Sequence, residues 1–249
     1  MRKIIITLIV VLCLGGFTVS GQNWAAKMAE TAMTIWKDSL DIVPGQPVKW
    51  RYDQGVILKG IEGLWIATGD KKYFDYIQKS MDLFVDGDGV IRTYKQSEYN
   101  LDNVLPGRNL LMLYNVTGKQ QYYKAALSLR EQLDTHPRIK TGGFWHKKVY
   151  PHQMWLDGLY MAEPFYAEWS NRFSDDTAFN DIARQFILME QYSRDAKTGL
   201  LLHGFDESRE QQWADKTTGR SPHVWARAMG WYGMALVDVL EQFPPGHPK

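Results

Sequence analysis

The sequence repeats itself in units that each hold two helical segments. One unit runs from Tyr52 to Val85, and a second runs from Leu101 to Leu133. Each unit has an Asp near its start, then an apolar segment, a Thr-Gly break, and a second segment that opens with two adjacent aromatic residues. One such pair cannot bury its apolar face alone, so we expect successive units to stack against one another.

Two more units follow, with changes to the pattern. The third starts at Leu156 and has "RFSDD" in place of the Thr-Gly break. The fourth starts at Ser221, which we expect to cap a helix, with Pro222 in the first helical position. Together with an N-terminal helix from about Trp24 to Leu40, these units predict eight helices.

The two helices of a unit differ in polarity. In the first unit, the first helix is apolar nearly all round, as Leu64, Trp65 and Ile66 illustrate, whereas the second carries Lys71 and Lys79 on a polar face. Helices that are apolar on all sides are buried, and amphipathic helices cover them. The sequence therefore predicts an all-α fold, an (α/α)6 toroid of inner and outer helices, incomplete here with about eight of twelve helices.

The composition narrows the possible partners. The chain has 249 residues, of which 45% are hydrophobic, so it can form one large domain with a substantial core. Its net charge is only +1 and its Lys and Arg residues form no long run, which argues against nucleic acid and acidic membranes as partners. The 10 Trp, 13 Tyr and 10 Phe residues suit a carbohydrate ligand, although core packing alone could also use them.

The N-terminus has the features of a secretory signal peptide. Arg2 and Lys3 precede an apolar stretch that is short for a membrane span, and small residues follow it. We expect cleavage after Gly21, which would leave one toroid domain over residues 22–249, exported to the periplasm without a membrane anchor. A lipid-modified form remains an alternative. Cys13, the one cysteine, lies in the apolar stretch, so the mature chain would have neither a disulfide nor a thiol nucleophile.

Polar residues occur where the predicted inner helices begin. If these helices share one direction, their N-terminal ends meet at one mouth of the toroid, with Asp102, Asp157, His146 and His203 around it. An Asp at a helix start is often only a cap, and Asp102 fits either role. The neighbours of Asp157 are apolar and should raise its pKa by desolvation. A raised pKa suits a group that donates and retrieves a proton near neutral pH, so Asp157 is the main catalytic candidate.

One cation lies in an otherwise apolar segment. Arg227 and Trp231 are four residues apart on one predicted helix and so share a face, with Trp225 just before them. The guanidinium could bind a substrate carboxylate through paired hydrogen bonds, or it could form an internal ion pair with one of the aspartates. Both readings remain open.

Motifs for other chemistries are missing from the sequence. The histidines show neither an HExxH motif nor a pair four residues apart, so we predict no zinc site, and "DGDG" lacks the later ligands of a calcium loop. The sequence also lacks a GxSxG motif, a P-loop, and a GxGxxG motif after a strand. We therefore predict neither a metal nor a cofactor.

Two motifs together resemble a known family. "WLDGLYM" after an aromatic-His loop, followed by "HVWARAMGW", resembles glycoside hydrolase family 105, the unsaturated rhamnogalacturonyl hydrolases, over roughly residues 24–240. The unsaturated glucuronyl hydrolases are more distantly similar. The resemblance implies a small unsaturated oligosaccharide from pectin degradation as the substrate. It also implies that the closing helices belong at the C-terminus, so that this chain would be a C-terminally truncated part of a longer product.

The resemblance also assigns roles to the polar residues. Asp157 matches the general acid/base, which protonates C4 of an unsaturated sugar acid and then takes a proton from the water that adds at C5. Asp102 matches a second acid, thought to contact the substrate and to hold the charge state of Asp157. His146 and His203 match histidines that position the water or the sugar.

A further set of aromatic and basic residues completes the expected site. Trp225, Arg227 and Trp231 match a wall that grips the unsaturated ring and its carboxylate. Tyr52 matches a tyrosine at the first inner helix.

Three other functions remain possible on the same fold. The substrate could be an unsaturated glucuronyl disaccharide from ulvan or another acidic glycan. The chain could instead be a non-catalytic oligosaccharide-binding toroid. A sugar epimerase would need a pair of catalytic histidines on inner helices, whereas we expect His146 and His203 in loops. The sequence leaves the oligomeric state open.

Overall fold

The computed structural model describes residues 23–37 and 47–248. Within them the chain is mostly helical, with one two-stranded sheet, so the predicted all-α class is confirmed. The elements are α2 (Trp24–Ile35), α3 (Tyr52–Thr68), α4 (Lys71–Asp82), η1 (Gln96–Glu98), η2 (Leu101–Asn103), α5 (Gly107–Thr117), α6 (Gln120–Thr135), β1 (Gln153–Trp155), α7 (Leu156–Phe173), α8 (Ala178–Ser193), β2 (Gly204–Asp206) and α9 (Ala226–Leu240).

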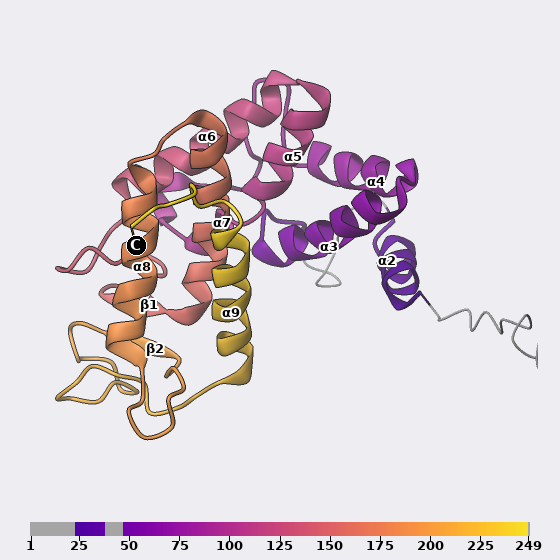
Figure 1. Cartoon of the computed structure of the whole chain (residues 1–249). Coiled ribbons are helices and arrows are strands. Elements are labelled where there is room, and N and C mark those ends of the chain that lie inside the picture. The colour runs from indigo at the N-terminus through magenta and orange to yellow at the C-terminus, as the bar shows by residue number, and fades with distance from the viewer. Residues whose placement is uncertain (1–22, 38–46, 249) are drawn as a thin grey trace, which may run out of the picture.

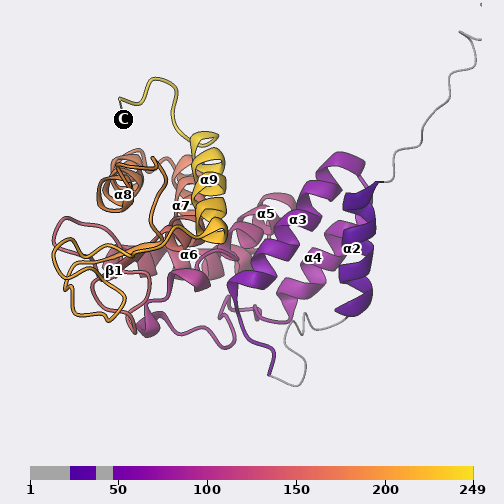
Figure 2. The ribbon, with the colours of Figure 1, turned by 90° about the horizontal axis from the view of Figure 1, so that it is seen from below.

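The helices form two layers. Helices α3, α5, α7 and α9 lie on the inner side, and α2, α4, α6 and α8 lie outside them (Figures 1 and 2). Each of α3, α5 and α7 packs on the outer helix that follows it and on the next inner helix. The described residues thus hold eight α-helices in the alternating order of an α/α toroid, as the repeat predicted.

The Thr-Gly breaks end the inner helices. Gly69 and Gly118 have φ angles of 68° and 67°, in the left-handed region where glycine is favoured. Each donates its N–H to a carbonyl of the last helical turn, the cap that a glycine at this position forms. The repeat recognised in the sequence is therefore a repeat of helix stop signals.

Helix α7 is the most buried of the inner helices. Leu156, Ala162, Phe165 and Ala167 are fully buried along its length, and it packs on α5, α8 and α9. By contrast, α4 buries one face only, because it belongs to the outer layer. The predicted burial of the inner helices on all sides therefore holds for α7 but not for α3, where Ile66 is 71% exposed.

The prediction that Ser221 caps the last inner helix is wrong. Helix α9 begins at Ala226, and Trp225 is its N-cap with extended backbone angles. The residues before it are held in extended form, because Ser221 donates its N–H to Gly204 and His223 accepts the N–H of His203. These bonds to the neighbouring strand segment replace the helical bonds that the sequence suggested.

Two other boundaries also differ from the expectation. Helix α5 begins at Gly107, and the residues before it form the short helix η2, since Pro106 has no N–H to continue a helical ladder. Helix α2 ends at Ile35 rather than near Leu40, because the backbone of Trp36 leaves the helical region.

The two strands were not predicted. β1 pairs antiparallel with β2, with Trp155 opposite Gly204. Strands of three residues leave almost no alternating pattern in a sequence, so periodicity could not find them.

The predicted signal peptide, residues 1–21, lies outside the described residues. Among the described helices, none combines the length and the apolar character that crossing a bilayer requires.

Candidate functional site

The strand pair brings His203 against Asp157. Asp157 lies in the first turn of α7, directly after β1, and His203 directly precedes β2. The N–H of Leu156 donates to the carbonyl of His203 over 3.1 Å, which extends the β1–β2 pairing by one step. As a result, Nε2 of His203 lies 3.1 Å from Oδ2 of Asp157, and the two side chains are 24% and 13% exposed.

The pKa of Asp157 is lowered, not raised as the sequence suggested. Burial is the largest single influence and acts upward, but the hydrogen bond and charge of His203 and the charge of His146 together outweigh it. The sequence showed the apolar neighbours but not the imidazole from a segment 46 residues away. The prediction was wrong because it considered the desolvation of Asp157 but not the hydrogen bond from His203.

Asp102 has partners of its own. It lies in η2, where Nζ of Lys147 is 2.5 Å from Oδ2 and Nε2 of His146 is 3.5 Å from Oδ1. Lys147 was not among the predicted residues, although it follows His146 directly in the sequence. The ammonium of Lys147 forms an ion pair with Asp102 and so stabilises its negative charge.

His146 lies between the two acids. It is 3% exposed, and burial lowers its pKa to about 4, against the opposing influence of Asp102 and Asp157. At neutral pH the ring is therefore uncharged and can donate from one nitrogen only. Gly158 leaves room for it, since a Cβ there would lie 3.0 Å from Nδ1 of His146.

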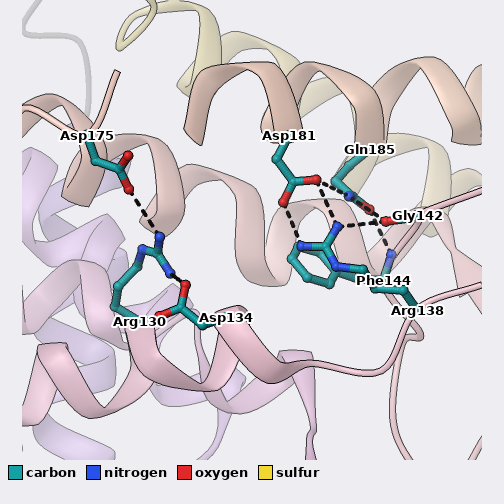
Figure 3. Close-up of polar contacts among 8 residues, drawn as sticks. All are labelled: Arg130, Asp134, Arg138, Gly142, Phe144, Asp175, Asp181 and Gln185. Atoms are coloured by element: carbon teal, nitrogen blue, oxygen red, sulfur yellow. Dashed lines mark hydrogen bonds and ion pairs between the residues drawn. The ribbon is translucent and has the colours of Figure 1, made fainter. Parts of the chain in front are cut away.

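Polar contacts from helix α8 fix the loop that carries His146. Figure 3 shows Arg138 paired with Asp181 through two hydrogen bonds of 2.8 and 2.7 Å, while Gln185 accepts the N–H of Phe144. Closer to the site, His146 donates its N–H to Gln153 in β1. The imidazole is thus placed by an outer helix and a strand rather than by an inner helix.

Arg130 anchors the other end of the same region. In Figure 3 it bridges Asp134, on its own helix α6, and Asp175, just before α8. This bridge and the Arg138 pair connect α6 and the loop after it to the segment around α8.

The aromatic wall is present in two parts. Trp225 is 40% exposed and packs its ring on His203, with 4.9 Å between ring centroids. Trp231 stacks on Tyr160 at 4.9 Å and meets Tyr52 edge-on at 6.4 Å. Among the described residues, Tyr52 forms no hydrogen bond with either aspartate, and its ring lies against Trp231.

Arg227 is exposed and lies over the ring of Trp225, at 3.8 Å from its centroid. It makes no ion pair with any residue that the structure describes, so the internal ion pair considered from the sequence is not formed there. Its guanidinium is free to bind an anion at the mouth.

A pocket of about 620 Å³ adjoins the acid cluster. Trp155, Trp213, Trp225, His203 and His223 contribute to its lining. Trp155, Trp213 and His223 were missed as site residues. Trp155 precedes Asp157 by two residues and His223 opens the motif "HVWARAMGW", so both could have been found from the two motifs, whereas Trp213 gave no signal in the sequence.

The described residues contain no group of three or more His, Cys, Asp and Glu side chains that could hold a metal ion. What the mouth offers is a carboxylate hydrogen-bonded to an imidazole, a second carboxylate beside an ammonium, and a free guanidinium among indole rings. Such a set can transfer protons and bind an anionic ring-shaped ligand.

A second charged cluster lies deeper along the inner helices, and we call it the floor. Arg108 on α5 bonds Glu168 on α7 and Asp238 on α9, each at 2.6 Å, and Lys59 bonds Glu62 on α3 at 2.7 Å. Glu168 is eleven residues beyond Asp157, or about 16 Å along the helix at 1.5 Å per residue. Lys59, Glu62, Arg108 and Glu168 also line a separate pocket of about 440 Å³.

Comparison with known proteins gives a family. The family described as Glycosyl Hydrolase Family 88 matches residues 24–249. A solved structure of a family 105 glycoside hydrolase from Clostridium acetobutylicum superposes with a TM-score of 0.85 and 45% identity, over 91% of this chain and 61% of that one. The predicted resemblance to family 105 is thereby confirmed.

Curated relatives agree with this assignment. "Unsaturated rhamnogalacturonyl hydrolase YesR" of Bacillus subtilis is 27% identical over 206 residues, which are 80% of this chain and 56% of the relative. "Protein Atu3128" of Agrobacterium fabrum is 44% identical over 84 residues, 34% of this chain and 36% of the relative. The chain thus spans less than two thirds of the length of each of these three proteins.

Proposed function

The chain belongs to glycosyl hydrolase family 88, and from this premise we propose that it removes Δ4,5-unsaturated galacturonyl residues from the products of rhamnogalacturonan lyases. In this proposal, water adds to the C4=C5 double bond, and the glycosidic bond then breaks. The observation that carries the proposal is the hydrogen-bonded pair of Asp157 and His203 at the mouth. The relative named as an unsaturated rhamnogalacturonyl hydrolase supports the choice of sugar.

The proposed reaction starts with proton transfer to carbon. Asp157 gives a proton to C4, and the electron pair of the double bond forms the new C–H bond, leaving a cation at C5 that the ring oxygen stabilises. Water then adds at C5 and returns a proton to Asp157. The resulting hemiketal opens to a C5 ketone, and the hemiacetal left at C1 releases the leaving sugar as an alcohol. One water is consumed, and the acid ends in its starting state.

The lowered pKa of Asp157 makes His203 part of this chemistry. An isolated carboxyl with a low pKa would be ionised at neutral pH and could not donate. Because Nε2 of His203 lies 3.1 Å from Oδ2 of Asp157, a proton carried by the imidazole can pass to Asp157 as C4 takes one up. In this proposal, the pair is the acid and the base.

The anionic ring has a place at the mouth. Arg227, which pairs with no described carboxylate, can bind the carboxylate of the unsaturated uronic acid while Trp225 packs against the ring. In this proposal, Asp102 contacts the substrate and holds the charge state of Asp157, and His146 positions the water or the sugar. Trp231, with Tyr52 beside it, belongs to the wall around the unsaturated ring.

A second candidate shares this site. An unsaturated glucuronyl residue from ulvan or another acidic glycan has the same double bond and the same carboxylate. It differs in the sugar that leaves. A sugar epimerase is less well supported, because both His146 and His203 lie in loops.

The test is the loss of ultraviolet absorbance from unsaturated galacturonyl-rhamnose, since hydration removes the conjugated double bond. Asp157→Asn should lower the rate by about 10²–10⁴-fold, the usual contribution of a general acid or base. Glu163→Gln is the matched control, because it makes the same carboxyl-to-amide change on the same helix. Steady absorbance with a wild-type chain shown by circular dichroism to be folded would leave a binding toroid as the better explanation.

We also propose that the protein acts outside the cytoplasm, in the periplasm. The basic start, apolar stretch and small residues of positions 1–21 support export. Mass spectrometry of the exported chain should then show Gln22 as the first residue.

A further inference from the structure

We propose that Trp155 is a positioning residue, whose indole ring holds the imidazoles of His146 and His203 in place beside the two acids of the mouth. In this role it acts on the reaction through the histidines rather than by binding the sugar. The inference rests on the proposed function and deepens it, because it names the side chain that keeps the proton-transfer groups together. Trp155 is the last residue of β1 and precedes the first turn of α7.

The indole of Trp155 lies against both imidazoles. His146 stacks on it with 4.5 Å between ring centroids and 18° between ring planes, and the centroid of His203 lies 5.4 Å away at 51°. Aromatic rings at such separations attract one another beyond the effect of the area that they bury. One side chain thus contacts the imidazole that lies between the acids and the imidazole that is hydrogen-bonded to Asp157.

Tyr150 extends this contact to the ammonium at the site. Its ring stacks on Trp155 with 5.0 Å between centroids and 18° between planes. Nζ of Lys147 lies 5.9 Å from the centroid of the tyrosine ring and also pairs with Asp102. Every side-chain partner of the two carboxylates that the structure describes therefore touches the ring of either Trp155 or Tyr150.

The indole is itself held in one orientation. Its Nε1 donates to Oε1 of the buried Gln153 over 3.0 Å, and the backbone carbonyl of the same glutamine accepts the N–H of His146. On the paired strand, a Cβ at Gly204 would lie 3.1 Å from Cδ1 of Trp155, so the glycine leaves the ring its space. A ring that is fixed by a hydrogen bond and by a strand pair can fix the rings that pack on it.

The orientation of the imidazoles matters for the charge of Asp157. Burial acts to raise the pKa of Asp157, whereas the hydrogen bond and charge of His203 and the charge of His146 lower it. A hydrogen bond weakens steeply when its donor and acceptor are misaligned. An imidazole that could turn away would therefore leave the effect of burial unopposed, although both histidines would still be present.

Trp155 also lines the pocket at the mouth, so a contact with the sugar is the alternative role. The two roles predict different kinetics. Loss of a contact that is equally strong in the ground state and the transition state raises KM and leaves kcat unchanged. Displacement of the proton-transfer groups instead lowers kcat, because it acts on the chemical step.

The first experiment needs no turnover, because it measures the pKa of Asp157 by carbon-13 NMR. Trp155→Ala should raise this pKa, since the imidazoles lose the ring that holds them, and Trp155→Phe, which keeps a ring, should raise it less. If the change only admitted water to Asp157, desolvation would weaken and the pKa would fall instead. An unchanged or lower pKa in Trp155→Ala would overturn the inference.

Trp65→Ala is the matched control, because Trp65 is also a partly buried indole that packs on an aromatic ring, with 5.1 Å between its centroid and that of Phe74. It lies thirteen residues after Tyr52, the first residue of α3, or about 20 Å along the helix at about 1.5 Å per residue. This variant should leave the pKa of Asp157 unchanged. A rise equal to that in Trp155→Ala would mean that any loss of packing has the same effect, and would overturn the inference.

The second experiment follows the hydration of unsaturated galacturonyl-rhamnose by the same variants. Trp155→Ala should lower kcat about tenfold and change KM by less than about twofold, and Trp155→Phe should recover most of the loss in kcat. A raised KM with an unchanged kcat would assign Trp155 to sugar binding and overturn the inference. A folded wild-type protein that leaves this substrate intact would contradict the proposed function alone, while the pKa of Asp157 in the variants still decides the inference.

Discussion

At the mouth of the toroid, the carboxylates of Asp102 and Asp157 lie beside imidazoles, whereas at the floor Glu168 and Asp238 share the guanidinium of Arg108. Each cluster includes one acid of helix α7, Asp157 at the mouth and Glu168 at the floor. A guanidinium keeps its proton at any physiological pH, whereas the imidazole of His203, hydrogen-bonded to Asp157, can pass a proton to that carboxylate. The partner, rather than the acid, therefore decides which end of the barrel can do proton chemistry.

Two acids on helix α7, six residues apart, also differ because one has a hydrogen-bond partner and the other does not. Asp157 is partly exposed, bonded to His203, and has a lowered pKa. Glu163 is fully buried, neither of its oxygens has a partner, and burial raises its pKa well above the usual value. The raised pKa that the sequence suggested for Asp157 occurs at Glu163, where it serves no reaction that we propose.

The largest effect on stability should come from the floor. Arg108→Ala leaves two carboxylates without their guanidinium, and breaking a buried pair in this way costs about 3 kcal/mol. Urea denaturation followed by circular dichroism measures the loss. Arg172→Ala, an exposed arginine of the same pocket, should change the free energy of unfolding by less than about 0.5 kcal/mol. Equal values for both variants would mean that the floor is no more structural than the surface.

A smaller effect is expected at the mouth. His203→Phe keeps a ring between the indoles but removes the bond and charge that lower the pKa of Asp157. Burial then dominates, so the pKa of Asp157 should rise above its usual range. Carbon-13 NMR of the carboxyl groups measures this titration, and Asp157→Asn identifies the Asp157 signal by its absence. The rate of hydration should fall about tenfold, because no imidazole remains to supply a proton to Asp157. His203→Gln can donate a hydrogen bond but cannot carry charge. The pKa of Asp157 in this variant should therefore lie between its value in wild type and its value in His203→Phe. An unchanged Asp157 titration in the Phe variant would remove His203 from the account.

How far the sequence reached can be judged from particular residues. The inner and outer helices followed from Thr-Gly stops and polarity, which are local signals. Asp157, Asp102, His146 and His203 were placed at one mouth because helix direction is also predictable. His203 as the partner of Asp157, Lys147 on Asp102, and Trp213 in the pocket depend on a strand pair and a loop that no local pattern encodes.

The smallest effect is expected at Glu163 itself. Its raised pKa means that the folded state holds a proton that the unfolded state has lost above pH 4.5, so this group lowers stability as pH rises. Glu163→Gln removes that dependence. We expect little difference from wild type near pH 4 and a gain of about 1 kcal/mol at pH 8, measured as the difference between two denaturation series. A variant that loses stability at pH 8 would show that the ionised carboxylate is satisfied in the fold.

The most direct test of the central claim is to run the wild-type reaction in D₂O and examine the released uronic acid by NMR at early times. Proton transfer from the Asp157–His203 pair to carbon predicts one deuterium at C4 and loss of the C4=C5 double bond. A released uronic acid that keeps its double bond and carries no deuterium at C4 would contradict hydration and indicate ordinary cleavage at C1.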